Sequence, residues 1–205
     1  MNNKWDESYN MEEYRYGESP NLFFKQTIDR LPIGKILLPA DGEGRNSVYA
    51  AIQGWSVDAF DQSQQAKGKA LRLAHKKSVD FSYKVINFED IAQSYITDSY
   101  DVIALIYVHL PEGLKVQCYR SLLPFLKNGG HIIIEGFSKD HVKHQQQNPS
   151  AGGPPHVEMM YSKEEILSIF DFLEINLLEE IELELSEGIG HRGKASVIRF
   201  IGKKV

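Results

Sequence analysis

The sequence has 205 residues, 42% of them hydrophobic and 25% charged, and its formal net charge is −5. This length suits a single domain, 1–205, with a sizeable core, and the composition disfavours disorder. An acidic balance without a basic stripe disfavours a nucleic-acid partner. Cys118 is the single cysteine, so no disulfide framework forms within the chain. The longest apolar run, 102–108, is too short to span a membrane, and the N-terminus lacks an apolar signal core. We therefore expect a cytoplasmic enzyme or binding protein without a membrane partner.

The first 18 residues are polar and aromatic, with too few aliphatic side chains for a core helix. The aromatic residues of this stretch are Trp5, Tyr9, Tyr14 and Tyr16. Two interpretations stay open for 1–18: an arm packed on the sheet edge, and a lid over a ligand site. Ser19 and Pro20 then have the character of an N-cap and a first helical residue, for a helix ending near residue 32.

The stretch 35–63 contains the pattern on which the fold prediction depends. A short apolar strand at 35–38 leads into a small-residue turn at 40–44, a helix at 45–53 and a second strand at 57–60 that ends at Asp61. A turn without side chains lets a ligand contact the backbone, and the following helix offers unpaired N–H groups to an anionic group. An acid about 20 residues further on can accept hydrogen bonds from both hydroxyls of a ribose. The pattern favours an adenosine-bearing ligand over an ordinary tight turn.

The next elements alternate between helix and strand. Ser63 is predicted to cap a helix to about residue 77, whose basic residues are expected in solvent: Lys67, Lys69, Arg72, Lys76 and Lys77. A strand within 79–88 follows, and the run 100–107 is apolar on both faces, as in a parallel strand covered by helices. A helix at 111–127, stopped by 128–130, and a strand at 131–137 complete the series. This order predicts a doubly wound α/β sheet.

The segment 138–161 is long, polar and rich in Gly and Pro, which is typical of a functional or disordered loop. Because it follows a strand end, we expect a loop over the ligand cleft. Its histidines, His141, His144 and His156, match no strong metal-binding spacing, so no metal is expected.

The C-terminal part begins with a capping box at Ser162 for a helix through residue 172. Two long strands, 173–185 and 194–203, are joined by the polar segment 186–193, which predicts a hairpin at the end of the sheet. The nucleotide-binding half of a dehydrogenase rarely ends in this way.

Several of these motifs resemble those of class I S-adenosylmethionine (SAM)-dependent methyltransferases. The run Gly42-Glu43-Gly44-Arg45-Asn46, followed by a helix and a Gly-Trp-x-Val-x-x-Phe-Asp-x-Ser strand, is similar to the small-molecule branch that includes tellurite-resistance methyltransferases. The Tyr-Gly-x-x-Pro-Asn segment at 16–21, the Gly-Gly-Pro loop at 152–154 and the Glu-Gly-x-x-His-x-Gly turn at 187–193 extend the resemblance over nearly the whole chain. It implies a seven-stranded, mostly parallel Rossmann-like sheet with an antiparallel C-terminal hairpin strand, and SAM as the cofactor.

The resemblance also implies roles for individual residues. The cofactor-binding residues would be Tyr16, Ala40, Asp41, Gly42, Gly44, Asn46, Asp61, Gln62, Asn87, Phe88 and Ile106. The catalytic or acceptor side would comprise His109, His191 and Arg192. Topology alone places His109 at the ligand edge of a strand, although it could instead cap the next helix. Asn87 and Phe88 likewise suit either adenine recognition or a strand end with a helix cap.

One departure from the family pattern concerns Leu38, Pro39 and Ala40, which stand where an acid, a variable residue and the first glycine are usual. Either Asp41 supplies the missing carboxylate, or cofactor affinity is weak or lost. The expected function is methyl transfer to a small-molecule acceptor such as a thiol or a metalloid, in a monomer or homodimer. The alternatives are a non-catalytic SAM-binding or regulatory protein and an NAD(P)-linked oxidoreductase.

Overall fold

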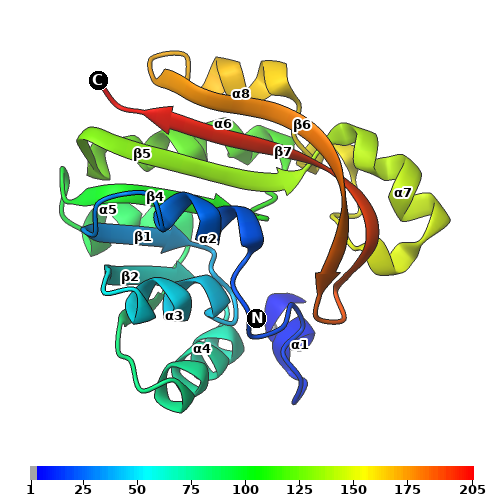
Figure 1. The fold of residues 1–205 in the computed structure, drawn as a ribbon, viewed down its shortest axis with the longest axis horizontal. Helices are drawn as coiled ribbons and strands as arrows, with labels where there is room; N and C mark the ends of the chain where they lie inside the picture. Colours follow the sequence, from blue (N-terminus) through cyan, green and yellow to red (C-terminus); the bar gives the residue numbers. More distant parts are fainter. Residues whose placement is uncertain (1–3) are drawn as a thin grey trace.

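The computed structural model describes residues 4–205 as one sheet with helices on both faces (Figure 1). The strands are β1 (Lys35–Pro39), β2 (Ser56–Asp61), β3 (Ser82–Val85), β4 (Tyr100–Ile106), β5 (Leu126–Phe137), β6 (Glu174–Glu187) and β7 (His191–Lys203). The α-helices are α1 (Lys4–Tyr9), α2 (Leu22–Ile28), α3 (Arg45–Ile52), α4 (Gln64–Lys76), α5 (Ile91–Ser94), α6 (Glu112–Ser121), α7 (Val142–Gln147) and α8 (Lys163–Ile169). Short 3₁₀ turns lie at Phe88–Asp90, Leu123–Phe125, Lys139–His141, Pro149–Ala151 and Val157–Met159.

The seven strands lie in the order β3-β2-β1-β4-β5-β7-β6. The pairs from β3 to β5 are parallel, whereas β7 runs antiparallel to both β5 and β6. The predicted doubly wound sheet with an antiparallel C-terminal hairpin is therefore confirmed. The chain order reverses between β1 and β4, and ligands of open α/β sheets bind beyond the carboxyl ends of the strands at such a point.

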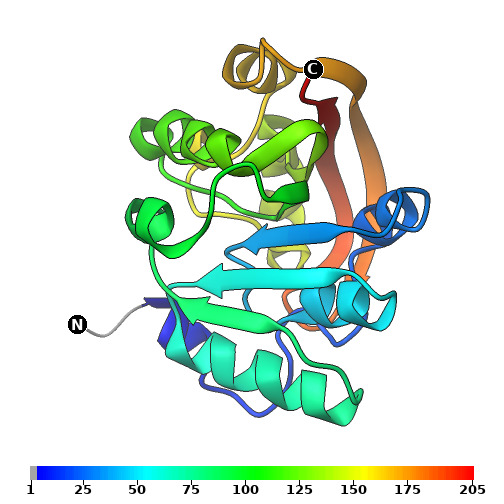
Figure 2. The same ribbon diagram turned by 90° about the vertical axis from the view of Figure 1, so that its left-hand side faces the viewer.

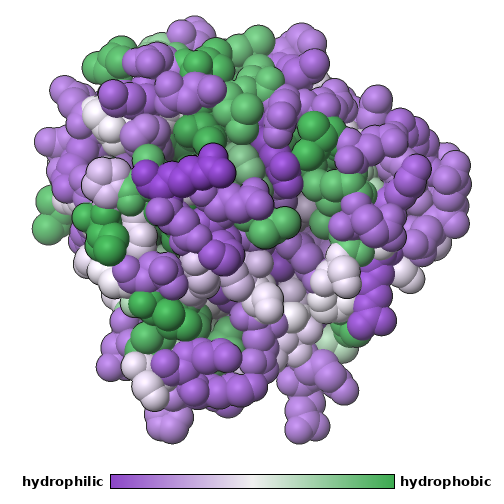
Figure 3. All heavy atoms as spheres, viewed as in Figure 1, coloured by the Kyte–Doolittle hydropathy of each residue, from purple (hydrophilic) through white to green (hydrophobic). Residues whose placement is uncertain are grey.

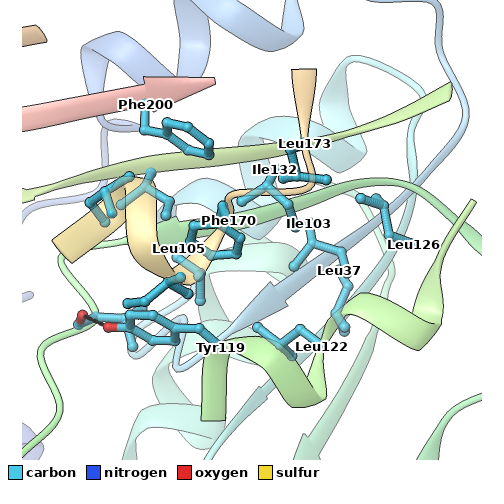
Figure 4. Close-up of a cluster of buried hydrophobic side chains, with 14 of the residues drawn as sticks. Leu37, Ile103, Leu105, Tyr119, Leu122, Leu126, Ile132, Phe170, Leu173 and Phe200 are labelled. Atoms are coloured by element: carbon cyan, nitrogen blue, oxygen red, sulfur yellow. Dashed lines mark hydrogen bonds between the residues drawn. The ribbon is translucent and has the colours of Figure 1, made fainter. Parts of the chain in front are cut away.

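Two hydrophobic layers hold the helices against the sheet. In β1, Leu37 points to the layer that includes residues of α5, α6 and α8, whereas Ile36 and Leu38 point to the layer that includes residues of α2, α3 and α4. Figure 4 shows the first layer, in which Leu37 and Ile103 lie with Tyr119 and Phe170. The central strands are thus apolar on both faces because each face carries helices.

The segment after α6 differs from the prediction. The helix ends at Ser121 instead of residue 127, and β5 begins at Leu126 instead of residue 131. Pro124 lacks the N–H group that a continuing helix needs, which accounts for the early end. Gly129 and Gly130, expected as the helix stop, instead lie within the long strand β5.

Other differences are local. The cap of α2 is Asn21, whose side chain accepts a hydrogen bond from Phe24, and not Ser19. Lys69 was expected in solvent but its side chain is 1% exposed. The segment 138–161 contains α7 and short 3₁₀ turns, so it is more regular than a free loop.

The hairpin connection is shorter than expected, because β6 ends at Glu187 and β7 begins at His191. His191 and Arg192 therefore belong to a strand, where successive side chains point to opposite faces.

The N-terminal segment forms the short helix α1, which packs beside α4 (Figures 1 and 2), and the chain after α1 continues to the tip of the β6–β7 hairpin. The backbone N–H groups of Ile189 and Gly190 both donate to the carbonyl of Arg15, at 2.9 Å each, which fixes this neighbourhood. The face in Figure 3 is mainly hydrophilic, with hydrophobic residues in separate groups. Within residues 4–205, no helix has the length and apolar character that crossing a membrane requires.

Candidate active site

The predicted glycine turn joins the carboxyl end of β1 to the start of α3. Ala40, Gly42 and Gly44 all have positive φ, at 50°, 60° and 84°. Ala40 thus adopts the left-handed conformation that glycine takes without cost, at a strain of about 1–2 kcal/mol for an L-residue. Gly44 is the N-cap of α3, so the free N–H groups of that helix begin at the turn. The turn thus has left-handed backbone at all three small-residue positions, Ala40 included.

Two carboxylates lie at this turn. Asp61, at the end of β2, accepts hydrogen bonds from Gly42 N at 3.1 Å and Ser63 N at 2.9 Å, and burial raises its pKa to about 6. Asp41 accepts from the Ser47 hydroxyl at 2.6 Å, while its other oxygen is buried without a partner among residues 4–205. Burial raises the pKa of Asp41 to about 7.

These two acids fit a bound SAM molecule. The unpartnered oxygen of Asp41 can accept a hydrogen bond from an ammonium group, and each oxygen of Asp61 retains a lone pair for a ribose hydroxyl.

The residues expected at the adenine have mostly structural contacts here. Asn87 is exposed and caps the 3₁₀ turn that follows β3, in a reciprocal pair with Asp90. Phe88 contacts Phe60 edge to face, with ring centroids 5.2 Å apart. Ile106 ends β4 and packs against the opposite layer, which includes residues of α2, α3 and α4, and Gln62 is exposed beside Asp61. Asn46 is buried and accepts a hydrogen bond from Asn21 N at 2.9 Å, so it ties the starts of α2 and α3 together.

The N-terminal arm, which we define as residues 4–18, lies against the glycine turn. Asp6 accepts a hydrogen bond from the Ser63 hydroxyl at 2.6 Å, at the start of α4. The Lys69 ammonium donates to the carbonyls of Met11 and Glu13 and lies 2.6 Å from the Glu43 carboxylate, itself part of the turn. The arm is thus held by the same residues that frame the turn. Residues 1–3 of the predicted arm 1–18 lie outside the described residues.

A buried ion pair links the turn to the hairpin. Arg45, the first residue of α3, lies 3.0 Å from Glu187 at the end of β6. The same oxygen of Glu187 is 3.0 Å from His191 Nδ1. Arg45 and His191 hold the pKa of Glu187 at about 2. Glu187 is therefore ionised and only accepts, which assigns the proton of neutral His191 to Nδ1.

His191 lies among aromatic rings. Its ring centroid is 4.5 Å from that of Tyr16 and 4.4 Å from that of Tyr107, and its side chain is 4% exposed. Burial lowers its pKa, with Glu187 acting in the opposite direction. Tyr107 has a φ of 55°, and its buried hydroxyl has no hydrogen-bond partner within residues 4–205.

The other two residues expected on the acceptor side have different positions. His109 Nε2 accepts from Phe137 N at 3.1 Å and its Nδ1 lies 3.0 Å from the Met159 carbonyl, so both ring nitrogens are occupied by backbone. Burial lowers the pKa of His109 to about 3. Arg192 is exposed, and its Nε donates to the Gly188 carbonyl at 2.6 Å. Strand alternation sends Arg192 away from the face that carries His191. This geometry leaves His191 as the acceptor-side candidate.

Sequence reasoning missed the charged residues that surround His191. Glu187 and Arg45 lay inside quoted motifs, yet nothing in the motifs indicated that they pair. Arg15 has a buried Nε without a hydrogen-bond partner and no ion pair in the described part of the chain. Glu135 in β5 is 1% exposed and accepts from Asn21 at 2.5 Å and Arg199 at 2.6 Å. The sequence did contain a signal for Glu135, because a glutamate within an otherwise hydrophobic strand is unusual.

Known proteins share this fold. Similar solved structures include TehB from Haemophilus influenzae (17% identity, TM-score 0.72, 98% of this chain and 66% of that chain). They also include a SAM-dependent methyltransferase from Methanosarcina mazei (19%, 0.67, 91% and 99%) and magnesium protoporphyrin IX methyltransferase from Synechocystis PCC 6803 with bound SAH (13%, 0.65, 89% and 78%). No curated protein sequence matches the chain significantly.

The chain shares the fold of these SAM-dependent methyltransferases, as the resemblance in sequence implied. The family model described as tellurite resistance protein TehB matches residues 5–142. The chain therefore belongs to the TehB family.

Proposed function

We propose that this protein transfers the methyl group of SAM to a small acceptor with a soft nucleophilic atom, such as a thiol that carries an anionic group or a metalloid oxyanion. The observation that carries the proposal is the pair of contacts Arg45–Glu187 and Glu187–His191, which links a histidine whose Nε2 is unoccupied among the described residues to the helix that begins at the glycine turn. The family name, tellurite resistance protein, supports a metalloid among the acceptors.

In this reaction SAM supplies a methyl group activated by a sulfonium. Asp41 would pair with its ammonium group, and Asp61 would accept from its ribose hydroxyls. The acceptor atom forms a bond to the methyl carbon as the bond to sulfur breaks. Close positioning of the two reactants supplies much of the rate enhancement. His191 Nε2, which has no hydrogen-bond partner within residues 4–205, would take the proton of a thiol acceptor.

The charge on the acceptor would be matched by Arg15. The Arg15 Nε is buried without a hydrogen-bond partner within residues 4–205, and a bound anion would accept from it. The Arg15 guanidinium lies 5.9 Å from the ring centroid of Tyr16, which itself contacts His191. Arg15 thus takes the role that the sequence suggested for Arg192.

The test begins with calorimetric titration of S-adenosylhomocysteine (SAH) into wild type and Asp61→Ala. We expect binding that the variant loses, while NADH does not bind. Transfer of a labelled methyl group from SAM is then measured with thiols, tellurite and small amines. Loss of turnover in His191→Ala with SAH binding retained supports the proposal, and turnover with amines alone contradicts the acceptor class.

The second candidate is a non-catalytic SAM-binding or regulatory protein. The packing of Tyr9 against Gly42 favours it, because the Tyr9 side chain occupies space beside the backbone that a cofactor would contact. SAH binding without turnover on any acceptor class would support it.

A further inference from the structure

Glu187 accepts hydrogen bonds from three donors that belong to different parts of the fold. One of its oxygens contacts both the Arg45 guanidinium and His191 Nδ1, each at 3.0 Å. Its other oxygen accepts from the Asn21 side chain at 3.2 Å. Its side chain is 16% exposed, so these three donors reach it in a largely dry environment.

We propose that Glu187 is a positioning residue for methyl transfer: it holds His191 with Nδ1 protonated, so that the Nε2 lone pair faces the acceptor, and through Arg45 it sets the distance between this histidine and the cofactor turn. This inference rests on the proposed function. Glu187 itself touches neither reactant.

The orientation follows from the contacts of the ring with its neighbours. Tyr16 and Tyr107 lie against the imidazole, and a Cβ built at Gly152 would be 2.8 Å from His191 Cδ2. With the ring confined, the only rotational and tautomeric choice that satisfies Glu187 has its proton on Nδ1. The carboxylate therefore decides which nitrogen can accept a proton.

The register of the hairpin fixes this pair. Glu187 and His191 are cross-strand partners at the end of the β6–β7 ladder. Gly188 has a φ of 60°, and a Cβ there would be 2.4 Å from the Arg15 carbonyl. The tight turn between the two residues thus accepts no side chain at Gly188 without moving the arm.

Arg45 gives the arrangement its second function. It follows Gly44 directly, and its guanidinium also donates to the Tyr16 carbonyl at 3.3 Å. A single buried ion pair therefore connects the cofactor turn, the arm and the acceptor histidine.

Electrostatics around His191 set the expected pH dependence. The titratable and charged groups that face it are Glu187, Arg45, Arg15, Tyr16, Tyr107, His109 and His141. Among them, the Glu187 carboxylate raises the pKa of His191 whereas the arginines lower it. Removing the carboxylate therefore lowers this pKa further, and the rising limb of kcat/KM moves to lower pH.

The first measurement is on the wild type and needs no turnover. ¹⁵N NMR of labelled histidine, with the His191 signals assigned by their loss in His191→Gln, reports which nitrogen carries the proton at neutral pH. We expect Nδ1–H. A dominant Nε2–H form overturns the proposal, even if the protein proves not to bind SAM.

The second measurement compares Glu187→Gln with Glu182→Gln. Glu182 lies on β6, the same strand as Glu187, and contacts His144 Nε2 at 3.2 Å. The two residues therefore form a matched carboxylate–histidine pair away from the glycine turn. We expect Glu187→Gln to lower kcat/KM for a thiol acceptor by at least ~10-fold, which is part of the ~10²–10⁴-fold that a positioned general base typically contributes. The rising limb of its kcat/KM profile should move to lower pH, and its SAH affinity should change less than its kcat. The control should match wild type.

The outcomes separate the two proposals. A wild type that neither binds SAH nor turns over defeats the proposed function, and the NMR result then still decides the role of Glu187. An active Glu187→Gln with an unchanged pH profile defeats the positioning role alone. If Glu187→Gln does not fold, the wild-type tautomer is the deciding observation.

Discussion

The hydroxyl of Tyr9 lies against the glycine turn so closely that a Cβ built at Gly42 would be 2.7 Å from it. Tyr9 is 5% exposed and belongs to the arm, so this contact closes the turn on one side. A ligand that contacts the backbone of Gly42 has to share this space with the Tyr9 side chain. We propose on this basis that the arm acts as a lid.

Tyr9→Phe tests the lid, because it removes the hydroxyl and keeps the ring. We expect faster association of SAH, measured by stopped-flow fluorescence. Tyr14→Phe is the control, since the Tyr14 hydroxyl belongs to the same arm but donates to the Lys69 carbonyl. Equal association rates in all three proteins would rule out gating by Tyr9.

Removal of one partner of the Lys69–Glu43 pair should be strongly destabilising, because the two side chains are only 1% and 3% exposed. Lys69→Met leaves the Glu43 charge buried without its partner, which typically costs about 3–5 kcal/mol. Urea unfolding should show this loss, and the double variant Lys69→Met/Glu43→Gln should recover part of it. A loss below ~1 kcal/mol would mean that water reaches Glu43 in solution.

Ala40→Gly should stabilise the protein. Ala40 has a φ of 50°, and relief of this strain is worth about 1 kcal/mol after the added freedom of glycine in the unfolded chain is subtracted. Ala51→Gly, within α3, is the control of opposite sign and should cost about 1 kcal/mol. Equal losses in both variants, measured by thermal unfolding, would contradict a strained turn.

Asp41 should make stability depend on pH. Its pKa rises from 3.8 to about 7 in the fold because of burial. The folded state therefore binds a proton that the unfolded state has lost, and stability falls as pH rises from about 4 to about 7. Asp41→Asn should lose this slope, so the variant gains on wild type as pH rises. Parallel pH curves of unfolding free energy would contradict the raised pKa.

The elements that could be predicted from the sequence are those with a local signal. The strands β1, β2 and β4 are bounded by glycine, acid or polar residues, and α4 has the hydroxyl cap that was expected at Ser63. The end of α6 was misplaced because the glycines at 129 and 130 were weighted above Pro124, which ends the helix first.

The candidate site could be predicted only in part. Chain order alone predicts that the glycine turn lies close to Asp61, since the turn follows β1 and Asp61 ends the adjacent strand β2. The contacts of Arg45 with Glu187 and of Lys69 with Glu43 join residues 142 and 26 positions apart, and no local pattern reports such pairs. The face to which each β7 side chain points could not be predicted until the first residue of the strand was known. Alternation along β7 places His191 and Arg192 on opposite faces.

The two halves of the site are built over very different lengths of chain. Gly42, Asp61 and the end of β4 come together only when the parallel strands β1, β2 and β4 have paired. Glu187 and His191 face each other across one hairpin and are separated by three residues. That hairpin lies at the edge of the sheet, and Arg45 joins its Glu187 to the cofactor turn. Under the proposed function, exchange of this hairpin between relatives would alter acceptor preference while the glycine turn and Asp61 stay unchanged.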